Sequence, residues 1–274
     1  VAPGLAAPFD RIDAAQAEAS WNRDSGEIVV SRLSVKGPAG ALSLSGLAEP
    51  WGAGPTGWSL DLRVDRLEAT EAAGFVAPLA FSGGRLQAEA LPAEGRVELS
   101  SLELAADFPD AGPIRLHAQG VASLEEGGPR LALSFGADPF GAAALKRAWP
   151  IFAAPGAREW VDENVEAARL TGMTGAFWMA PGETPEVTMD FGFADLEGSI
   201  LEGMPRLTGA AGEGRATLTR FEMSFEAAQT TPPGGEPISL AGSRFVIPDL
   251  IEDPQPAAPV IRGAGRLVDL MALI

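Results

Sequence analysis

Trp58-Ser-Leu-Asp-Leu-Arg-Val-Asp65 is the stretch that decides the fold of this chain, because apolar and polar side chains alternate along it with a period of two. In an extended strand, successive side chains point to opposite faces, so the stretch predicts a β-strand with one apolar and one polar face. The same alternation returns at residues 41–45, 131–135, 187–193 and 238–240. Because turn signals rich in Gly and Pro separate these stretches, we expect an antiparallel meander.

Several apolar stretches change their parity midway. A single strand keeps one apolar face through such a change only where a bulge inserts a residue and bends the strand, and bent strands favour a curved sheet. Alternatively, each change marks the end of one short strand and the start of the next. The changes run from Ile28 and Val30 to Leu33 and Val35, from Val97 and Leu99 to Leu102 and Leu104, and from Ala216 and Leu218 to Phe221, Met223 and Phe225.

Two segments in the middle of the chain have the pattern of helices. Residues 138–148 begin with Asp138-Pro139, an N-cap residue followed by a proline suited to the first helical position. Residues 155–166 place apolar side chains at helical spacing, which predicts an amphipathic helix. Weaker helical patterns lie at residues 70–75 and 267–274.

The composition combines a net charge of −17 with a positive mean hydropathy of +0.10. Such an acidic chain is repelled by phosphate backbones, which argues against nucleic-acid binding. No cysteine is present, which excludes disulfides, thiolate nucleophiles and Cys-type zinc sites. The apolar runs, such as residues 75–81 and 149–157, are far shorter than the about 20 residues that a bilayer requires. Since the first residues do not resemble a signal peptide, we expect targeting elements to lie outside this sequence.

We find no catalytic or metal-binding pattern. His117 is the single histidine and falls on the less apolar side of a strand-like stretch, so we interpret it as a solvent-facing residue. Acidic pairs such as Glu125-Glu126 lack the regular spacing of calcium loops, and the glycine-rich segments lack a phosphate-loop pattern. We therefore expect no enzyme, no metal and no cofactor. A polysaccharide-cleaving enzyme with paired carboxylates is a distant third interpretation.

The C-terminal half of the sequence resembles the YhdP-type AsmA-like proteins. The resemblance rests on the order and spacing of short motifs over about residues 138–274, and before them only on the rhythm of strands and turns. A Trp-Pro pair, an Ala-Arg-x-Trp helix and a glycine-containing return to β structure follow one another at residues 145–150, 155–161 and 168–172. Further matching motifs lie at residues 187–193, 203–207, 212–214, 243–249 and 263–267.

This resemblance implies a section of a bridge-like lipid-transfer protein. Proteins of that family are anchored in the bacterial inner membrane, extend through the periplasm and form a long curved β-sheet with an apolar concave face. They are implicated in moving phospholipid toward the outer membrane and in maintaining its barrier. The chain would then be an interior, periplasmic section that lacks the anchor, and phospholipid would be its partner.

An apolar trough could hold lipid tails, because each CH₂ group removed from water contributes roughly 0.8 kcal/mol. Each apolar strand residue could equally be core that packs against the helices, since periodicity identifies an apolar face and not what covers it. The candidate lining residues are Ile28, Val30, Leu42, Leu44, Trp58, Leu60, Leu62, Val64, Val97, Leu99, Leu131, Leu133, Phe135, Val187, Met189, Phe191, Phe193, Met223 and Phe225.

The helical segment is interpreted as an insert in the sheet. Its apolar residues Trp149, Phe152, Trp160 and Val161 either cap the groove or cover a patch of the sheet, and we favour the cap because open sheets need edge protection.

The predicted fold is therefore mainly β, a long, strongly curved antiparallel sheet that forms an apolar groove. We divide it into β-groove repeats at residues 1–137, the helical insert at 138–166 and a β-groove continuation at 167–274 that ends in a short helix. The alternative function is a structural or adhesive β-solenoid section with a closed core and no ligand.

Overall fold

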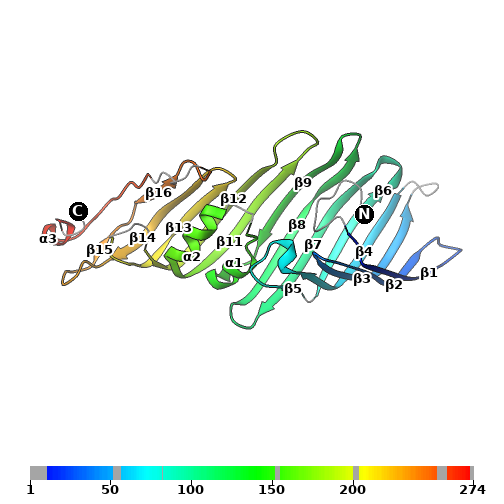
Figure 1. The fold of residues 1–274 in the computed structure, drawn as a ribbon, viewed down its shortest axis with the longest axis horizontal. Helices are drawn as coiled ribbons and strands as arrows, with labels where there is room; N and C mark the ends of the chain where they lie inside the picture. Colours follow the sequence, from blue (N-terminus) through cyan, green and yellow to red (C-terminus); the bar gives the residue numbers. More distant parts are fainter. Residues whose placement is uncertain are drawn as a thin grey trace. The chain divides into compact units, whose positions relative to one another are not determined.

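The chain forms one large antiparallel sheet with three short α-helices in the described residues (Figure 1). The computed structural model describes residues 11–51, 57–81, 83–151, 155–199, 204–251 and 258–271. The sheet has 16 described strands, is open, and accounts for most of the structure, with 62% of residues in strands. The prediction of a mainly β, antiparallel fold with a small helical segment is confirmed.

The chain divides into two compact units. The N-terminal unit consists of Val1–Pro109, Pro113–Ala137 and Ala176–Glu186, and the C-terminal unit of Asp110–Gly112, Asp138–Gly175 and Val187–Ile274. The first elements are β1 (Ala14–Trp21), β2 (Ile28–Gly37), β3 (Gly40–Trp51), β4 (Gly57–Ala69), β5 (Leu79–Phe81), β6 (Gly84–Leu91), β7 (Arg96–Phe108), β8 (Gly112–Glu125) and β9 (Gly128–Ala137), with 3-10 turns at η1 (Glu71–Ala73) and η2 (Pro92–Glu94).

The later elements include the helices. They are β10 (Phe140–Gly141), α1 (Ala142–Ala148), α2 (Pro155–Asn164), β11 (Val165–Met179), β12 (Glu186–Gly198), β13 (Leu207–Thr217), β14 (Phe221–Thr230), β15 (Ile238–Ser239), β16 (Arg244–Ile247) and α3 (Leu267–Met271). The main strand order is β1-β2-β3-β4-β6-β7-β8-β9-β11-β12-β13-β14-β15, while β5, β10 and β16 pair with β4, β11 and β14. Strands next to each other in the sequence are therefore mostly neighbours in the sheet, as in a meander.

Cross-strand pairing places the apolar residues in rows. One row runs from Val30 through Gly46, Leu62 and Leu86 to Leu102, and thus crosses β2, β3, β4, β6 and β7. Residues that face each other in an antiparallel pair point to the same side, so each row belongs to one face. A parallel row contains Ile28, Ala48, Leu60, Ala88 and Leu99.

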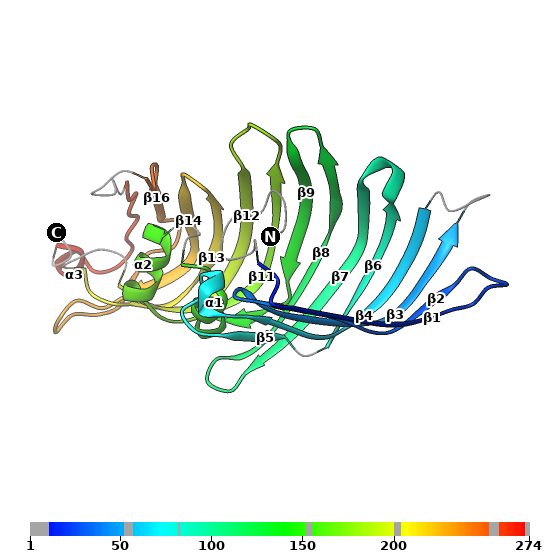
Figure 2. The same ribbon diagram turned by 45° about the vertical axis from the view of Figure 1, so that its right-hand side comes forward.

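Bulges explain two of the three parity changes. In β2, the pairs Val30 with Gly46 and Leu33 with Leu44 leave one extra residue on β2. In β7, Leu99 pairs with Ala88 and Ser101 with Gln87, which leaves Ser100 as the extra residue. Each bulge returns the next apolar residues to the original face, and Figure 2 shows β7 and β8 bending along their length. The third change separates two strands, because β13 ends at Thr217 and β14 begins at Phe221.

The first predicted helix begins later than expected. Asp138 is not its N-cap, because Phe140–Gly141 stay extended and pair with Leu170 and Arg169 of β11 before α1 starts. The pairing provides hydrogen-bond partners in β11 for the backbone of residues 140–141. A helix that began at residue 138 would lose them. The second helix is α2, and it ends at Asn164 because Val165 opens β11.

The two weaker helical patterns become short turns of helix. The first is the 3-10 turn η1, and the second is α3, whose predicted last residues, 272–274, lie outside the described part of the chain.

We predict that Gly46→Ala destabilises the N-terminal unit. Gly46 has a φ of 146°, and a Cβ there would lie 2.3 Å from the carbonyl oxygen of Asp61. The strained backbone should cost about 1–3 kcal/mol, visible as a lower urea midpoint by circular dichroism. Gly172→Ala is the control, because a Cβ on Gly172 meets nothing within 4 Å. Equal midpoints for both variants would contradict the prediction.

Candidate functional site

All ten candidate residues from β2, β3, β4 and β7 lie on one face of the N-terminal unit. The alternation in the sequence and the cross-strand pairs agree on this placement. The set is Ile28, Val30, Leu42, Leu44, Trp58, Leu60, Leu62, Val64, Val97 and Leu99. Leu44, Leu62 and Val64 are buried among their neighbours, six others are half-buried, and Val97 is 40% exposed. The face is therefore continuous and partly open.

The candidate residues of β9 form a similar surface with β8. Leu131, Leu133 and Phe135 pair with Ala122, Gly120 and Ala118, so each large side chain faces a small residue. All three large side chains are half-buried, because the small partners leave one flank of each uncovered. His117, which pairs with Gly136, lies on the opposite face and is exposed, as predicted for a solvent-facing residue.

A wide, open hollow of about 530 Å³ lies where these strands meet. Its lining includes Leu99 of β7, Gly120 of β8, Leu133 of β9 and Phe177 of β11. Glu98, Gln119 and Ser134, which belong to the opposite face of the same strands, also line it, so the hollow is not a purely apolar pocket. The sequence analysis missed Gly120 and Phe177. The glycine interrupts the apolar alternation, and nothing local shows which strand lies beside β9.

The opposite face of the N-terminal unit is charged. Arg85 Nε donates a hydrogen bond to Asp61 Oδ1 at 2.8 Å, and Arg63 Nε donates one to Asp65 Oδ1 at 2.9 Å. The hydrogen bond from Arg85 lowers the pKa of the Asp61 carboxyl. These exposed pairs add little to stability, but they keep this face hydrated. The sheet therefore separates apolar and charged residues onto its two sides.

The six candidate residues of β12 and β14 also share one face, within the C-terminal unit. They are Val187, Met189, Phe191, Phe193, Met223 and Phe225, and the pairs across β13 align Phe191 with Met223 and Phe193 with Phe225. Val187, Met189 and Phe191 are half-buried, whereas Phe193, Met223 and Phe225 are only 3–4% exposed. In this unit the apolar face is largely closed.

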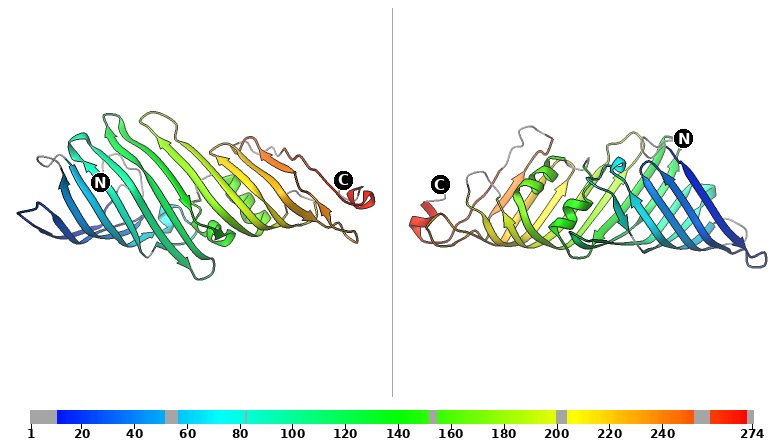
Figure 3. Two further views of the ribbon diagram at one scale, coloured as in Figure 1. Left: turned by 180° about the vertical axis from the view of Figure 1, so that it is seen from behind. Right: turned by 60° about the horizontal axis from the view of Figure 1, so that its bottom comes forward.

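The helices α1 and α2 cover that face (Figure 3). The Trp160 ring stacks on Phe245 with centroids 5.3 Å apart and lies 6.1 Å from Phe221. Val161 is buried, and Trp149 packs against the same cluster. Phe152, the fourth predicted residue of the helical segment, lies outside the described residues.

The space left under the helices is small. A wholly apolar cavity of about 60 Å³ lies between Trp160, Leu170, Phe191 and Met223, among others. An engineered apolar cavity that admits benzene measures about 150 Å³, so this one is too small for an acyl chain. In the described structure, the helical segment therefore acts as a cover.

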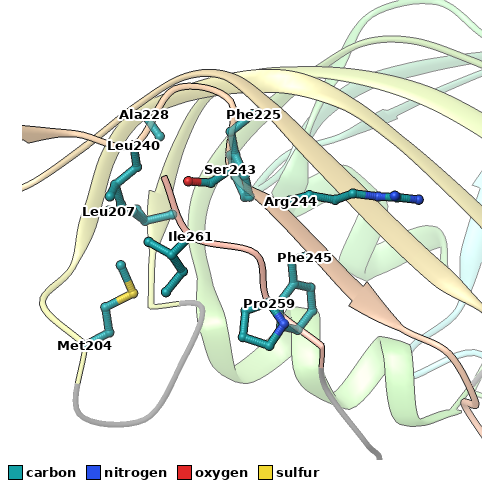
Figure 4. Close-up of a pocket in the computed structure, with 10 residues that line it drawn as sticks. All are labelled: Met204, Leu207, Phe225, Ala228, Leu240, Ser243, Arg244, Phe245, Pro259 and Ile261. Carbon is teal, nitrogen blue, oxygen red and sulfur yellow. The ribbon is translucent and has the colours of Figure 1, made fainter. Parts of the chain in front are cut away.

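A second cavity of the C-terminal unit is smaller still, at about 20 Å³. Figure 4 shows its lining side chains, among them Met204, Phe225 and Ile261, with the Arg244 guanidinium directed away. The hydroxyl of Ser243 is satisfied, because it accepts a hydrogen bond from the Arg262 backbone N–H at 2.9 Å. This cavity is a packing gap in a closed core.

Comparison of the chain with family models, with curated proteins and with solved structures finds no match. In the described part of the chain, no helix has the length and hydropathy to cross a membrane. The same residues contain no cluster of three acidic, histidine or cysteine side chains arranged to hold a metal ion.

We predict that Trp160→Ala destabilises the C-terminal unit by about 3 kcal/mol, because it removes the ring that packs against two phenylalanines. Amide exchange should accelerate in α2 and β14. The control is Glu159→Ala, which removes an exposed side chain from the same helix. If both variants exchange like the parent protein, α2 is not held by this contact.

Proposed function

We propose that the apolar face of the N-terminal unit binds phospholipid acyl chains. The observation that supports this most directly is the apolar face across β2, β3, β4, β6 and β7, opposite a charged face, whose large side chains are half-buried around a buried centre of Leu44, Leu62 and Val64. Large exposed apolar surfaces in proteins generally mark binding sites. The occupant must be apolar, because the rows contain no polar side chain to orient a polar ligand.

The dimensions suit a lipid tail. The row from Val30 to Leu102 crosses five strands, which at about 4.8 Å per strand step spans about 19 Å. One leaflet of a bilayer's hydrocarbon core is about 15 Å thick, so an extended tail fits along a row. Contact along one side would gain about half of the roughly 0.8 kcal/mol per methylene that full burial provides.

The wider proposal is a section of a periplasmic lipid-transfer protein that shields tails between the inner and outer membranes. The order of motifs at residues 145–172 supports it through the resemblance to the YhdP-type AsmA-like proteins. The absence of cysteine is compatible with the periplasm. Anchoring of the complete protein in the inner membrane belongs to the same proposal, as does a role in outer-membrane lipid homeostasis.

The C-terminal unit favours the second candidate, a structural β-section with a closed core. There the same kind of apolar face lies under α1 and α2, and Phe193 is 4% exposed. The two candidates therefore differ chiefly in the N-terminal unit. A lipid-binding test on that unit separates them.

We predict that Val30→Glu weakens acyl-chain binding by at least about tenfold, because the carboxylate must lose water when a tail covers it. Val30 lies on the apolar face, beside Leu62 across Gly46. The measurement is titration with a fluorescent fatty-acyl phospholipid, together with extraction of lipid that copurifies with the protein.

Val29→Glu is the matched control, since Val29 is the adjacent residue on the opposite face and is already 42% exposed. It should bind lipid like the parent chain. Circular dichroism checks that both variants are folded. If the parent chain carries no lipid and takes up none, the closed β-section replaces this proposal.

A further inference from the structure

Four of the 6 tryptophans belong to the N-terminal unit and lie at strand ends. Trp21 is the last residue of β1 and Trp51 the last of β3, while Trp58 is the second residue of β4 and Trp178 lies next to the end of β11. The other two, Trp149 and Trp160, pack against the core of the C-terminal unit. Of the four at the strand ends, Trp21 and Trp51 are exposed, whereas Trp58 and Trp178 are half-buried.

These strand ends meet along one edge of the unit. Trp21 pairs with Ile28, whose partner Ala48 lies near the end of β3, and Trp58 pairs with Ala90 at the end of β6. Further along, the Leu124 N–H donates a hydrogen bond to the Gly95 carbonyl at 2.8 Å.

The β8–β9 turn then contacts the β11–β12 turn, because a Cβ on Gly127 would lie 2.9 Å from Pro181. Figure 2 shows the β6–β7, β8–β9 and β11–β12 turns along its upper side. We define the tryptophan edge as residues 21–28, 48–51, 57–58, 90–97, 124–130 and 178–186.

Apolar side chains on the tryptophan edge are unusually exposed. The exposed fractions are 65% for Trp21, 42% for Trp51 and 72% for Leu124. Trp21 and Trp58 extend from the apolar face. Trp51 lies on the other face, where its ring covers Gly57. Indole rings thus flank the edge on both sides of the sheet.

The edge is acidic. Arg96 and Arg130, two of its three arginines, pair with Glu98 and Glu125. The remaining acidic residues outnumber the third arginine, Arg23. They are Asp24, Glu27, Glu49, Glu94, Glu126, Glu183 and Glu186. An anionic membrane would repel this edge, since basic residues supply the attraction to acidic headgroups.

We propose that the tryptophan edge docks on the surface of a bilayer of zwitterionic phospholipids, with its indole rings in the headgroup region. Indole combines a large apolar ring with a polar N–H, and it accumulates at the boundary between hydrocarbon and water. Trp21 and Trp51, the two exposed tryptophans, lie on opposite faces of the sheet, so both faces of the edge present an indole ring to such a surface. The acidic residues select against anionic lipid.

Docking of the edge on a membrane would extend the proposed function, but it does not require that the apolar face binds acyl chains. Trp58 stands on the edge and also begins the apolar face that continues through Leu60. If that face binds acyl chains, a tail leaving the bilayer at the edge would enter it directly. Membrane docking and tail binding are separate events and can be measured separately.

The test is flotation of the full chain with phosphatidylcholine vesicles. The parent chain should float, and the double variant Trp21→Ser/Trp51→Ser should bind at least about tenfold less. Replacing part of the phosphatidylcholine with phosphatidylglycerol should weaken binding at low salt, with recovery as salt screens the repulsion. Vesicle lipids brominated near the headgroup should quench the parent's tryptophan fluorescence.

The matched control is Ile12→Ser/Val76→Ser. Both residues are 55% exposed and lie by the opposite ends of the strands, so this variant should float like the parent chain. Absence of flotation, equal loss in both double variants, or stronger binding to phosphatidylglycerol vesicles would overturn the docking proposal. Absence of flotation would leave the edge to a protein partner.

Val30→Glu separates the two proposals, because Val30 lies within the apolar face, two residue pairs further from the edge than the Trp21–Ile28 pair, and leaves all four tryptophans in place. If this variant floats with vesicles but loses the fluorescent acyl probe, both proposals hold. If the parent chain floats but takes up no acyl probe, the docking proposal holds and the tail-binding proposal fails. If the parent chain takes up the acyl probe but does not float, the tail-binding proposal holds and the docking proposal fails.

Discussion

Cross-strand pairing that keeps most of the large apolar side chains of a strand on one side is the constraint on which this structure depends. Side chains along a strand alternate between its two faces, so a single inserted residue would move every following side chain to the opposite face. In β2 and β7 the sequence changes parity at the same point at which the backbone bulges, and the two effects cancel. The result is a sheet whose charged pairs, such as Asp61 with Arg85, all face away from the leucine rows.

The two units use this arrangement differently. In the C-terminal unit, Trp160 and Val161 of α2 close the apolar face, and the remaining cavity of about 60 Å³ is too small for a lipid tail. In the N-terminal unit, the corresponding face stays partly open, with residues such as Val30, Leu60 and Leu99 half-buried. The chain thus contains one apolar face that helices cover and one that stays partly exposed. The covered face of the C-terminal unit is the reference for a closed core in this protein.

Much of the fold follows from local pattern. Alternation predicted the strands and placed the candidate residues of β2, β3, β4 and β7 on a common face, because register follows the apolar face. It could not decide that Phe193 and Met223 would be buried, since their burial depends on α2, which lies elsewhere in the sequence. The start of α1 was predicted wrongly, because Phe140 finds a strand partner in Leu170 that no local signal reveals. The tryptophan edge escaped notice for the same reason: its residues meet only when five hairpin ends align.

The most direct test of the account is photocrosslinking with a phospholipid that carries a diazirine within its acyl chain, followed by peptide mass spectrometry. If the apolar face of the N-terminal unit holds lipid tails, the crosslinks should concentrate on half-buried residues of that face, Val30, Leu60 and Leu99. Peptides crosslinked through the outward-facing Val29 or Asp61 instead, or a folded protein with no crosslink above background, would contradict it.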